Sequence, residues 1–342
     1  MAGLIAVAGL LALLAQDRAL TAHADTLNLG LGPHTVTGRV VTASGSIPPK
    51  LQVMIHYPTE RGASGSGCEL KPDGRFVAHG LGNGTYVFSL EPVSDGPLDH
   101  PSGFESGSTV VTVRDSDIDD VVITAAAGTT VRGSVRFDET RPGAMRPENV
   151  VVHAALAKTE WAGPFDSAPV REDGTFEIPD VHGPRVFKFG WTATPGTYWT
   201  PRKVLLDGRE ITNVPVDFST EKWTSLEIVF TQGWTGIIGR VEDIAGLPVS
   251  ACVVMLPEDP DLRRGWSTAV GTAESDGRGR FYFSNMPAGD YFLLAHEAET
   301  CPPAHEVVAS ARDVPRAATR ASVAEGATVR VVLTAATRSS RP

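Results

Sequence analysis

The stretch "VREDGTFEIPDVHGPRVFKFGW", residues 170–191, is the part of the sequence that decides the fold. Its Asp-Gly pair at 173–174 predicts a tight turn, because aspartate can bond the turn backbone and glycine accepts a positive φ. Apolar residues alternate after Phe176, stop at a Gly-Pro pair, and alternate again from Phe187. This pattern predicts two antiparallel strands with one buried face.

The same pattern occurs three times in the 342-residue chain. Each copy opens with a glycine-containing strand: "TVTGRVV" at 35–41, "TVRGSVRF" at 130–137 and "GIIGRVED" at 236–243. The aligned glycines are Gly38, Gly133 and Gly239, so the copies are 133 − 38 = 95 and 239 − 133 = 106 residues apart. A spacing of this length is typical of whole β-sandwich domains and is too long for a solenoid or propeller repeat.

Two further signals recur within each copy. An Asp-Gly turn followed by phenylalanine begins at Asp73, Asp173 and Asp276. A second glycine turn then leads to Tyr86 in the first copy, Arg185 in the second and Tyr291 in the third. Glycine and proline, at 35 and 25 residues, also favour many short strands joined by turns.

These observations predict an all-β chain, a tandem array of three β-sandwich domains behind an N-terminal signal helix, and the family that the shared motifs resemble implies Greek-key or prealbumin-like sandwiches. We call them the first repeat (25–126), the second repeat (127–232) and the third repeat (233–336), followed by a tail at 337–342.

The shared motifs, "GRV" or "GSV", then "DGxF", then "PAGDY", resemble those of the bacterial carboxypeptidase regulatory-like domain. That family belongs with the Cna-B-type and transthyretin-like modules, whose superfamily is similar to carbohydrate-binding domains. The segment "LLDGREITNVPVDF" at 205–218 is similar to a linker of such repeat proteins. The resemblance implies a fold but no single function, because one sandwich serves adhesion, sugar binding, spacing and accessory roles.

The N-terminus predicts export. An apolar run from Leu4 to Leu14 precedes Ala22-His23-Ala24, a small-x-small cleavage site, although no basic residue precedes the run. We therefore expect a signal peptide at 1–24 and a secreted, periplasmic or surface location; an uncleaved anchor or a buried helix is the alternative. No other segment of the sequence is long and apolar enough to cross a membrane.

Charge and cysteine content limit the classes of partner and the disulfides that the chain can form. The net charge is −10, and the basic residues are scattered, which argues against nucleic-acid binding. Six lysines against 24 arginines suggest a bacterial source. Cys252 and Cys301 fall in one repeat and can pair, leaving Cys68 free; three separate thiols are the alternative.

No pattern predicts a catalytic residue, a cofactor or a metal. His296 and Glu299 have the H-x-x-E spacing of metallocarboxypeptidases, but too little chain follows for a catalytic domain. His296, Glu297, Cys301, His305 and Glu306 form a cluster that we interpret as a polar loop. The acidic residues of "RDSDIDDVV" at 114–122 lack the glycine and glutamate of a calcium loop. Cna-B-type modules can carry a lysine–asparagine cross-link, which the lysine-free third repeat excludes for itself.

Three aromatic residues suggest a ligand site. Trp191, Tyr198 and Trp199 lie in the Pro/Gly-rich stretch "GWTATPGTYWTPRK" of the second repeat. Exposed rings stack on sugar faces, so we predict a carbohydrate site there; the alternative is that these rings cover the core. The predicted function is a non-enzymatic binding or spacer role at the cell envelope, with a polysaccharide or an envelope protein as partner. The competing hypothesis is an accessory module that contacts a peptidase or transporter.

Overall fold

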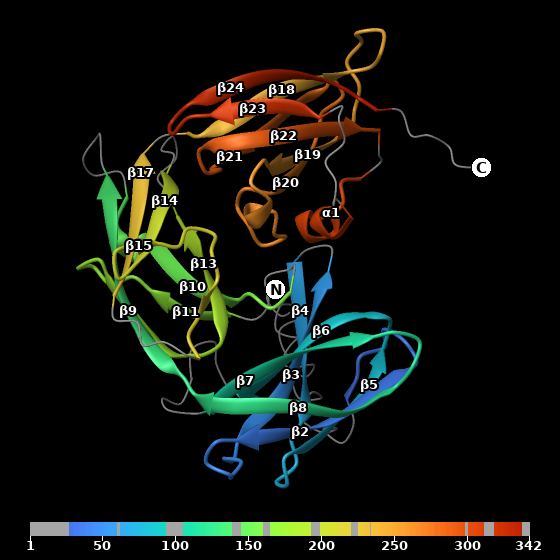
Figure 1. Ribbon diagram of the computed structural model, residues 1–342, viewed down its shortest axis with the longest axis vertical. Helices are drawn as coiled ribbons and strands as arrows, with labels where there is room; N and C mark the ends of the chain where they lie inside the picture. The colour runs from blue at the N-terminus through green and yellow to red at the C-terminus, as the bar shows by residue number, and fades with distance from the viewer. Residues whose placement is uncertain are drawn as a thin grey trace, which may run out of the picture. The chain divides into compact units, whose positions relative to one another are not determined.

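The computed structural model describes residues 27–59, 62–93, 105–138, 145–159, 165–192, 199–219, 225–232, 234–297, 300–310 and 318–336. Within these ranges the chain is built of strands, with two 3-10 turns at Pro147–Asn149 and Pro260–Leu262 and one helix, α1, at Ala304–Ser310 (Figure 1). The all-β prediction is confirmed. The predicted signal helix and the tail lie outside the described residues.

The chain divides into two compact units. The smaller unit includes the described parts of 27–56, 65–93 and 107–125. The larger unit holds the described residues from 126 onward, together with 57–59, 62–64 and 105–106. The boundaries expected at 126 and 232 between the three repeats stay a prediction.

The strands of the first repeat form one eight-stranded sheet. Its order is β1 (Leu27–Asn28), β5 (Arg75–Leu81), β2 (His34–Thr42), β8 (Ile118–Ala127), β7 (Glu105–Val113), β6 (Gly84–Pro92), β3 (Leu51–Thr59) and β4 (Gly62–Glu69). Phe76 on β5 and Phe88 on β6 are four strands apart in this order, yet their ring centroids are 5.8 Å apart. Strands four positions apart in a flat sheet are roughly 19 Å apart, so this sheet folds over and encloses its own core.

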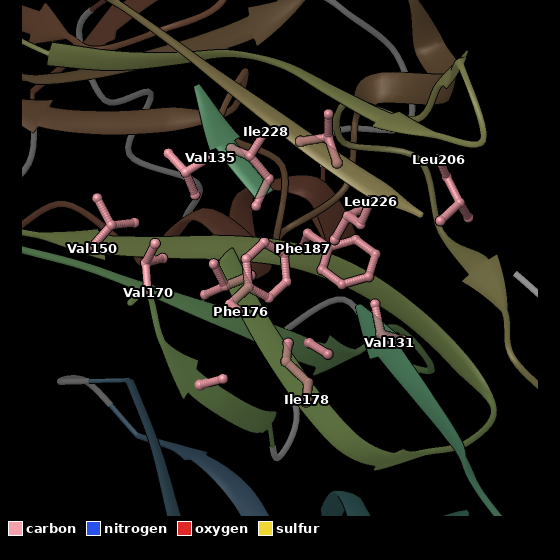
Figure 2. Packing of buried hydrophobic residues seen from close by; sticks show 14 of the residues in the cluster. Val131, Val135, Val150, Val170, Phe176, Ile178, Phe187, Leu206, Leu226 and Ile228 are labelled. Carbon is pink, nitrogen blue, oxygen red and sulfur yellow. The ribbon is translucent and has the colours of Figure 1, made fainter. Parts of the chain in front are cut away.

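The second repeat has two sheets. One has the order β12 (Thr175–Val181), β9 (Thr129–Asp138), β17 (Leu226–Gln232), β14 (Trp199–Leu206) and β15 (Arg209–Glu210). The other has the order β11 (Phe165–Pro169), β10 (Val150–Leu156), β13 (Pro184–Trp191) and β16 (Val216–Asp217). Buried side chains from both sheets form one core, in which Phe176 of β12 lies close to Phe187 of β13 (Figure 2).

The segment at 205–218 belongs to this core, not to a linker. It includes the β14–β15 hairpin and strand β16, and it buries Ile211 and Phe218 in the same cluster. The sequence resemblance suggested a connecting role, but these apolar side chains need a packed environment.

The third repeat repeats the two-sheet plan with fewer strands. One sheet has the order β21 (Arg280–Ser284), β18 (Gly236–Glu242) and β24 (Thr328–Thr334). The other has the order β20 (Gly271–Glu274), β19 (Cys252–Pro257), β22 (Gly289–His296) and β23 (Thr319–Val323). Ile237, Phe281, Val253 and Leu293 come from four different strands and lie in one buried cluster between the sheets.

Strand register explains why the opening glycine and the turn phenylalanine recur together. Gly38 pairs with Phe76, Gly133 with Phe176 and Gly239 with Phe281 across neighbouring strands. In each pair the phenylalanine ring covers the glycine, since a Cβ on the glycine would lie 2.4 to 2.5 Å from the ring Cζ. The glycine is therefore required by close packing of the ring, and the two positions form a single structural unit in each repeat.

The predicted turns are present, with one correction. Gly74 and Gly174 both have φ of +81°, and the aspartate before each accepts a hydrogen bond from the backbone two residues on. In the third repeat the glycine with positive φ is Gly279, at +72°, instead of Gly277. Asp276 lies two residues earlier than its counterparts and accepts bonds from the N–H groups of Arg278 and Arg280. Two glycines close together made the sequence alignment ambiguous there.

The residue after the second glycine turn anchors that turn. The Tyr86 hydroxyl donates to the Gly82 carbonyl at 3.0 Å, and the Tyr291 hydroxyl donates to the Pro287 carbonyl at 2.6 Å. Arg185 takes this place in the second repeat, where its Nε donates to the His182 carbonyl at 2.9 Å. Its guanidinium is buried and lies 3.1 Å from a carboxylate oxygen of Asp166. The arginine therefore keeps the turn anchor at the cost of burying its charge beside a partly exposed carboxylate.

Candidate functional site

Two of the three predicted sugar-binding residues lie in one aromatic cluster of the second repeat. Trp199 opens β14 and is 1% exposed. Its ring packs edge-on against Phe137, with centroids 5.4 Å apart, and Phe137 contacts Phe230 in turn. Trp199 therefore presents no ring face to solvent.

Trp191 ends strand β13 and reaches the same cluster from the opposite sheet. Its ring meets Phe230 edge-on at 5.6 Å, and it packs as a partly buried residue against the core. Tyr198 lies outside the described residues. The two tryptophans thus close one end of the sandwich core, as the alternative interpretation of the sequence expects, while the sugar site itself stays a prediction.

The indole of Trp199 has one unusual feature. Its Nε1 is buried and has no hydrogen-bond partner among the described residues. A buried N–H without a partner costs roughly 1–3 kcal/mol. The gain from packing the ring must exceed this cost, so Trp199 contributes mainly to the core.

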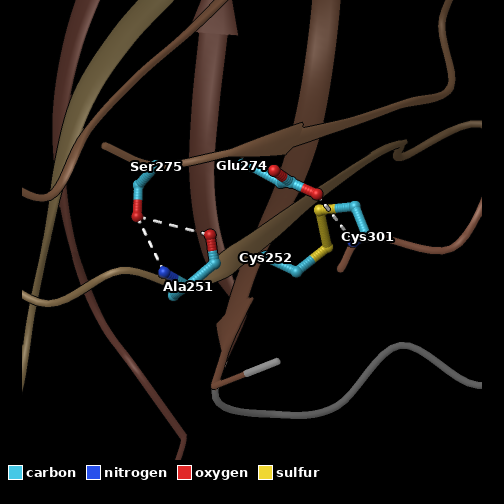
Figure 3. Close-up of a disulfide and its surroundings, with 5 residues drawn as sticks. All are labelled: Ala251, Cys252, Glu274, Ser275 and Cys301. Atoms are coloured by element: carbon cyan, nitrogen blue, oxygen red, sulfur yellow. Dashed lines mark hydrogen bonds between the residues drawn. A yellow bond between two sulfur atoms is a disulfide. The ribbon is translucent and has the colours of Figure 1, made fainter. Parts of the chain in front are cut away.

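The structure shows which cysteines pair. Cys252 of β19 and Cys301 form a disulfide that joins residues 49 apart, and Glu274 accepts a hydrogen bond from the Cys301 N–H at 3.2 Å (Figure 3). The bond ties the segment before α1 to the outer face of its sheet, where Val254 and Val307 are buried together. Cys68 is buried, and burial raises the pKa of its thiol to about 12, so it does not act as a nucleophile at neutral pH.

The candidate metal ligands do not converge within the described ranges. Cys301 is used by the disulfide, and Glu299 lies outside those ranges. The carboxylates of "RDSDIDDVV" have different hydrogen-bond partners. Asp117 accepts from the Thr35 N–H at 2.9 Å, and Asp119 accepts from the Thr37 hydroxyl at 2.8 Å. No group of three or more His, Cys, Asp and Glu side chains among the described residues is arranged to hold a metal ion.

The sequence interpretation missed a different aromatic surface, on the outer face of the β21–β18–β24 sheet. Strand register places Tyr282, Ile238 and Arg330 side by side in one row across the three strands. The next row holds Arg280, Arg240 and Val332. The signal is present in the alternation of "RFYFS" at 280–284, whose outward positions carry arginine and tyrosine.

Comparisons with known proteins leave the family open. No family model matches the sequence, and no curated protein matches it. Solved structures with some likeness include a streptococcal ancillary pilin (10% identity, 88% of this chain and 98% of that chain, TM-score 0.24). The major pilin subunit BcpA of Bacillus cereus has 13% identity over 88% of this chain and 98% of that chain, with a TM-score of 0.24.

The Bacillus anthracis TIE protein is also similar, at 10% identity over 89% of this chain, with a TM-score of 0.21. The chain spans half the length of that protein. Scores of this size do not carry the functions of those proteins to this chain. The resemblance to the carboxypeptidase regulatory-like domain stays a prediction.

In the portion of the chain with described structure, no helix is long and apolar enough to cross a bilayer.

Proposed function

We propose that this chain is an exported, non-enzymatic protein of the bacterial cell envelope, in which tandem sandwich repeats form a spacer that displays a binding surface. The observation that carries the proposal is the set of contacts joining the second and third repeats inside the larger unit. A spacer needs such contacts, because repeats connected only by a flexible linker do not hold a displayed surface at a defined place.

The apolar part of this junction centres on Trp266. The indole is 6% exposed and packs against Ala155 of β10 and Val186 of β13, which are cross-strand partners on the outer face of their sheet. A tryptophan from the third repeat therefore covers a sheet face of the second. Large aromatic side chains in such positions contribute much of the binding free energy of an interface.

Polar contacts fix the same junction. The Asn213 side chain donates to the Thr268 hydroxyl at 3.0 Å and accepts from the Thr268 N–H at 3.2 Å. Arg202 of β14 pairs with Glu325 at 2.8 Å. Paired bonds of this kind restrict sliding of the two surfaces, because each depends on direction as well as distance.

The disulfide supports the exported part of the proposal. Disulfides persist in oxidising compartments and are rare in the bacterial cytosol. Cleavage after Ala24 is expected, and N-terminal sequencing of protein from the native host tests it. A mature form that keeps Met1 in the cytoplasm contradicts export.

The junction is tested with Trp266→Ala in the full chain, with Tyr282→Ala as a matched control because that ring is exposed. We expect Trp266→Ala to increase the radius of gyration measured by small-angle scattering and to speed proteolysis between the second and third repeats. The control is expected to behave like the wild type. Unchanged scattering and proteolysis in Trp266→Ala contradict the spacer function.

Carbohydrate binding at Trp191, Tyr198 and Trp199 is the second candidate, supported by three rings within nine positions of one Pro/Gly-rich stretch. Trp199→Ala is a poor test, because loss of a core ring destabilises the repeat by about 3–5 kcal/mol. Tyr198→Ala is a better one, with retention on insoluble polysaccharides as the measurement. Equal retention of wild type and Tyr198→Ala excludes a contribution of this ring.

A further inference from the structure

The outer face of the β21–β18–β24 sheet is an open, basic and aromatic surface. We define the Tyr282 face by six residues: Trp234, Ile238, Arg240, Arg280, Tyr282 and Arg330. They line a shallow groove of about 890 Å³. Tyr282 is 68% exposed, and Val332 at the border of the groove is 62% exposed. Exposed large side chains gathered on one face commonly mark a binding surface.

The two rings of the face are placed by the strands beneath them. Tyr282 points outward because its neighbours Phe281 and Phe283 are buried in the core. Trp234 precedes β18, and its indole lies beside Gly236, with Nε1 and Cε2 both 3.4 Å from the position that a Cβ there would take. Gly236 lies two residues from Ile238 on the same side of the strand, so both rings belong to one side of the sheet.

The charge on this face is only partly compensated. Arg240 pairs with Glu242, and Arg280 pairs with Asp276 at 2.8 Å. The Arg330 side chain forms no hydrogen bond or ion pair with any described residue, although its backbone belongs to the β18–β24 ladder. The Arg330 guanidinium therefore has no counter-charge among the described residues. Arg330 lies on one side of Ile238 in the sheet, and the exposed Tyr282 lies on the other side.

The second repeat has the same face with different chemistry. At the positions of Tyr282 and Ile238 it carries Glu177 and Arg132, which form an ion pair at 2.9 Å. Arg136 on the same strand pairs with Glu227 at 3.0 Å. The sandwich fold therefore does not require aromatic residues or unpaired arginines on this sheet face. Of the second and third repeats, the third has them and the second does not.

The geometry points to the Tyr282 face as a binding site for an anionic polysaccharide, one whose sugar rings carry carboxylates. A pyranose ring has a face of C–H groups that packs on a flat aromatic side chain, and Tyr282 and Trp234 supply such rings with few rotatable bonds to restrict. A carboxylate on the next sugar pairs with a guanidinium fork, which Arg330 supplies without first losing a partner. This inference rests on the binding part of the proposed function.

Two other anionic partners fit less well. An acidic peptide usually gains affinity from main-chain bonds at a sheet edge, whereas the groove is formed by side chains on a sheet face. A single-stranded nucleic acid also stacks on rings, but it needs a positively charged groove that follows its phosphates, and two of the three arginines on this face are already paired with carboxylates.

The test uses the full chain and measures binding of soluble polygalacturonate by titration calorimetry and by affinity electrophoresis. We expect Tyr282→Ala and Arg330→Ala each to weaken binding about tenfold, equivalent to about 1.4 kcal/mol. Tyr282→Phe keeps the ring and is expected to bind like the wild type. Arg132→Ala, on the matching face of the second repeat, is the control and is expected to change nothing. Circular dichroism verifies that each variant is folded.

The outcomes separate the possible failures. If the wild type binds polygalacturonate and Tyr282→Ala binds equally well, the site assignment is wrong while the binding function stands. If the wild type binds neither polygalacturonate nor neutral amylose, both the inference and the binding part of the proposed function fail. If poly-glutamate binds as tightly as polygalacturonate and Tyr282→Ala affects neither, the face recognises charge alone, which overturns the sugar assignment.

Discussion

The second and third repeats share a glycine–phenylalanine contact in their cores and differ on their outward-facing residues. Gly133 over Phe176 and Gly239 over Phe281 are the same contact in two places. Facing outward, Lys188 of β13 occupies the position that Leu294 occupies on β22, five residues after the glycine of the second turn. Leu294 packs against the disulfide cluster beside α1, whereas the face around Lys188 is contacted by Trp266.

This difference shows that inward and outward positions are subject to different structural requirements. Inward positions must fill a core of fixed width, so the glycine and the phenylalanine that covers it recur from repeat to repeat. Outward positions face solvent, a helix or a neighbouring repeat, and each of these environments favours different side chains. Features specific to one repeat are therefore found on the outer faces.

The largest effect is expected where the two repeats agree. Gly133→Val places a side chain where the Phe176 ring and the Leu226 carbonyl lie, both 2.4 Å from the new Cβ. The ring must leave its position, and we expect a loss of about 3–5 kcal/mol, measured by urea denaturation. Ser134→Val on the outer face is the matched control, with an expected change below about 1 kcal/mol. Similar losses in both variants contradict the packing role of the glycine.

The disulfide sharpens the comparison next, because only the third repeat has one among the described residues. Replacement of Cys252 and Cys301 by serine removes a link that closes a 49-residue separation. The expected loss is about 2–4 kcal/mol in the third repeat. Hydrogen exchange localises the effect: faster exchange in β19 and β22 with unchanged β10 and β13 is the expected result. Equal acceleration in both repeats would falsify a local role.

The turn correction gives a smaller and more specific effect. Gly279 has a φ of +72°, and a Cβ there lies 2.3 Å from the Val241 carbonyl oxygen, whereas a Cβ at Gly277 has no atom within 4 Å. Gly279→Ala is expected to lower the unfolding free energy by about 1–2 kcal/mol, and Gly277→Ala by less than about 0.5 kcal/mol. Thermal melts of the two variants decide this. A larger loss for Gly277→Ala restores the turn that the sequence alone predicted.

Lys188→Leu copies the third repeat into the second, and its effect on stability is expected to be similar in size to that of Gly279→Ala and opposite in sign. Burial lowers the pKa of Lys188 from 10.5 to about 8. Between these pH values the unfolded chain holds a proton that the folded chain has lost, so wild-type stability rises with pH across this window.

The variant lacks this rise. Its advantage, about 1–2 kcal/mol, is expected at pH 7 and should decline between pH 8 and 10.5. Urea denaturation at pH 7 and pH 10 measures the difference, with Lys71→Leu as an exposed control. An advantage that does not depend on pH indicates better packing, without a contribution from the buried charge.

The sequence by itself determined the strand content, the turn positions and the repetition. Asp-Gly pairs, alternating apolar residues and recurring glycines determine local structure through residues a few positions away. Such local patterns can be recognised in the sequence. They failed only where two nearby glycines, Gly277 and Gly279, offered the same turn at two positions. The pairing of Cys252 with Cys301 was one of two open possibilities until the strands were placed.

Only the tertiary structure decided which aromatic residues face solvent. Trp199 and Tyr282 are both aromatic residues at strand positions, yet Trp199 is 1% and Tyr282 is 68% exposed. The difference arises because Trp199 falls at an inward position of β14 and Tyr282 at an outward position of β21, and which positions face inward depends on strand order and sheet packing across tens of residues. In the same way, Trp266 became a junction residue, and Arg330 came to lie in one row with Tyr282, only after distant strands had paired in a defined register.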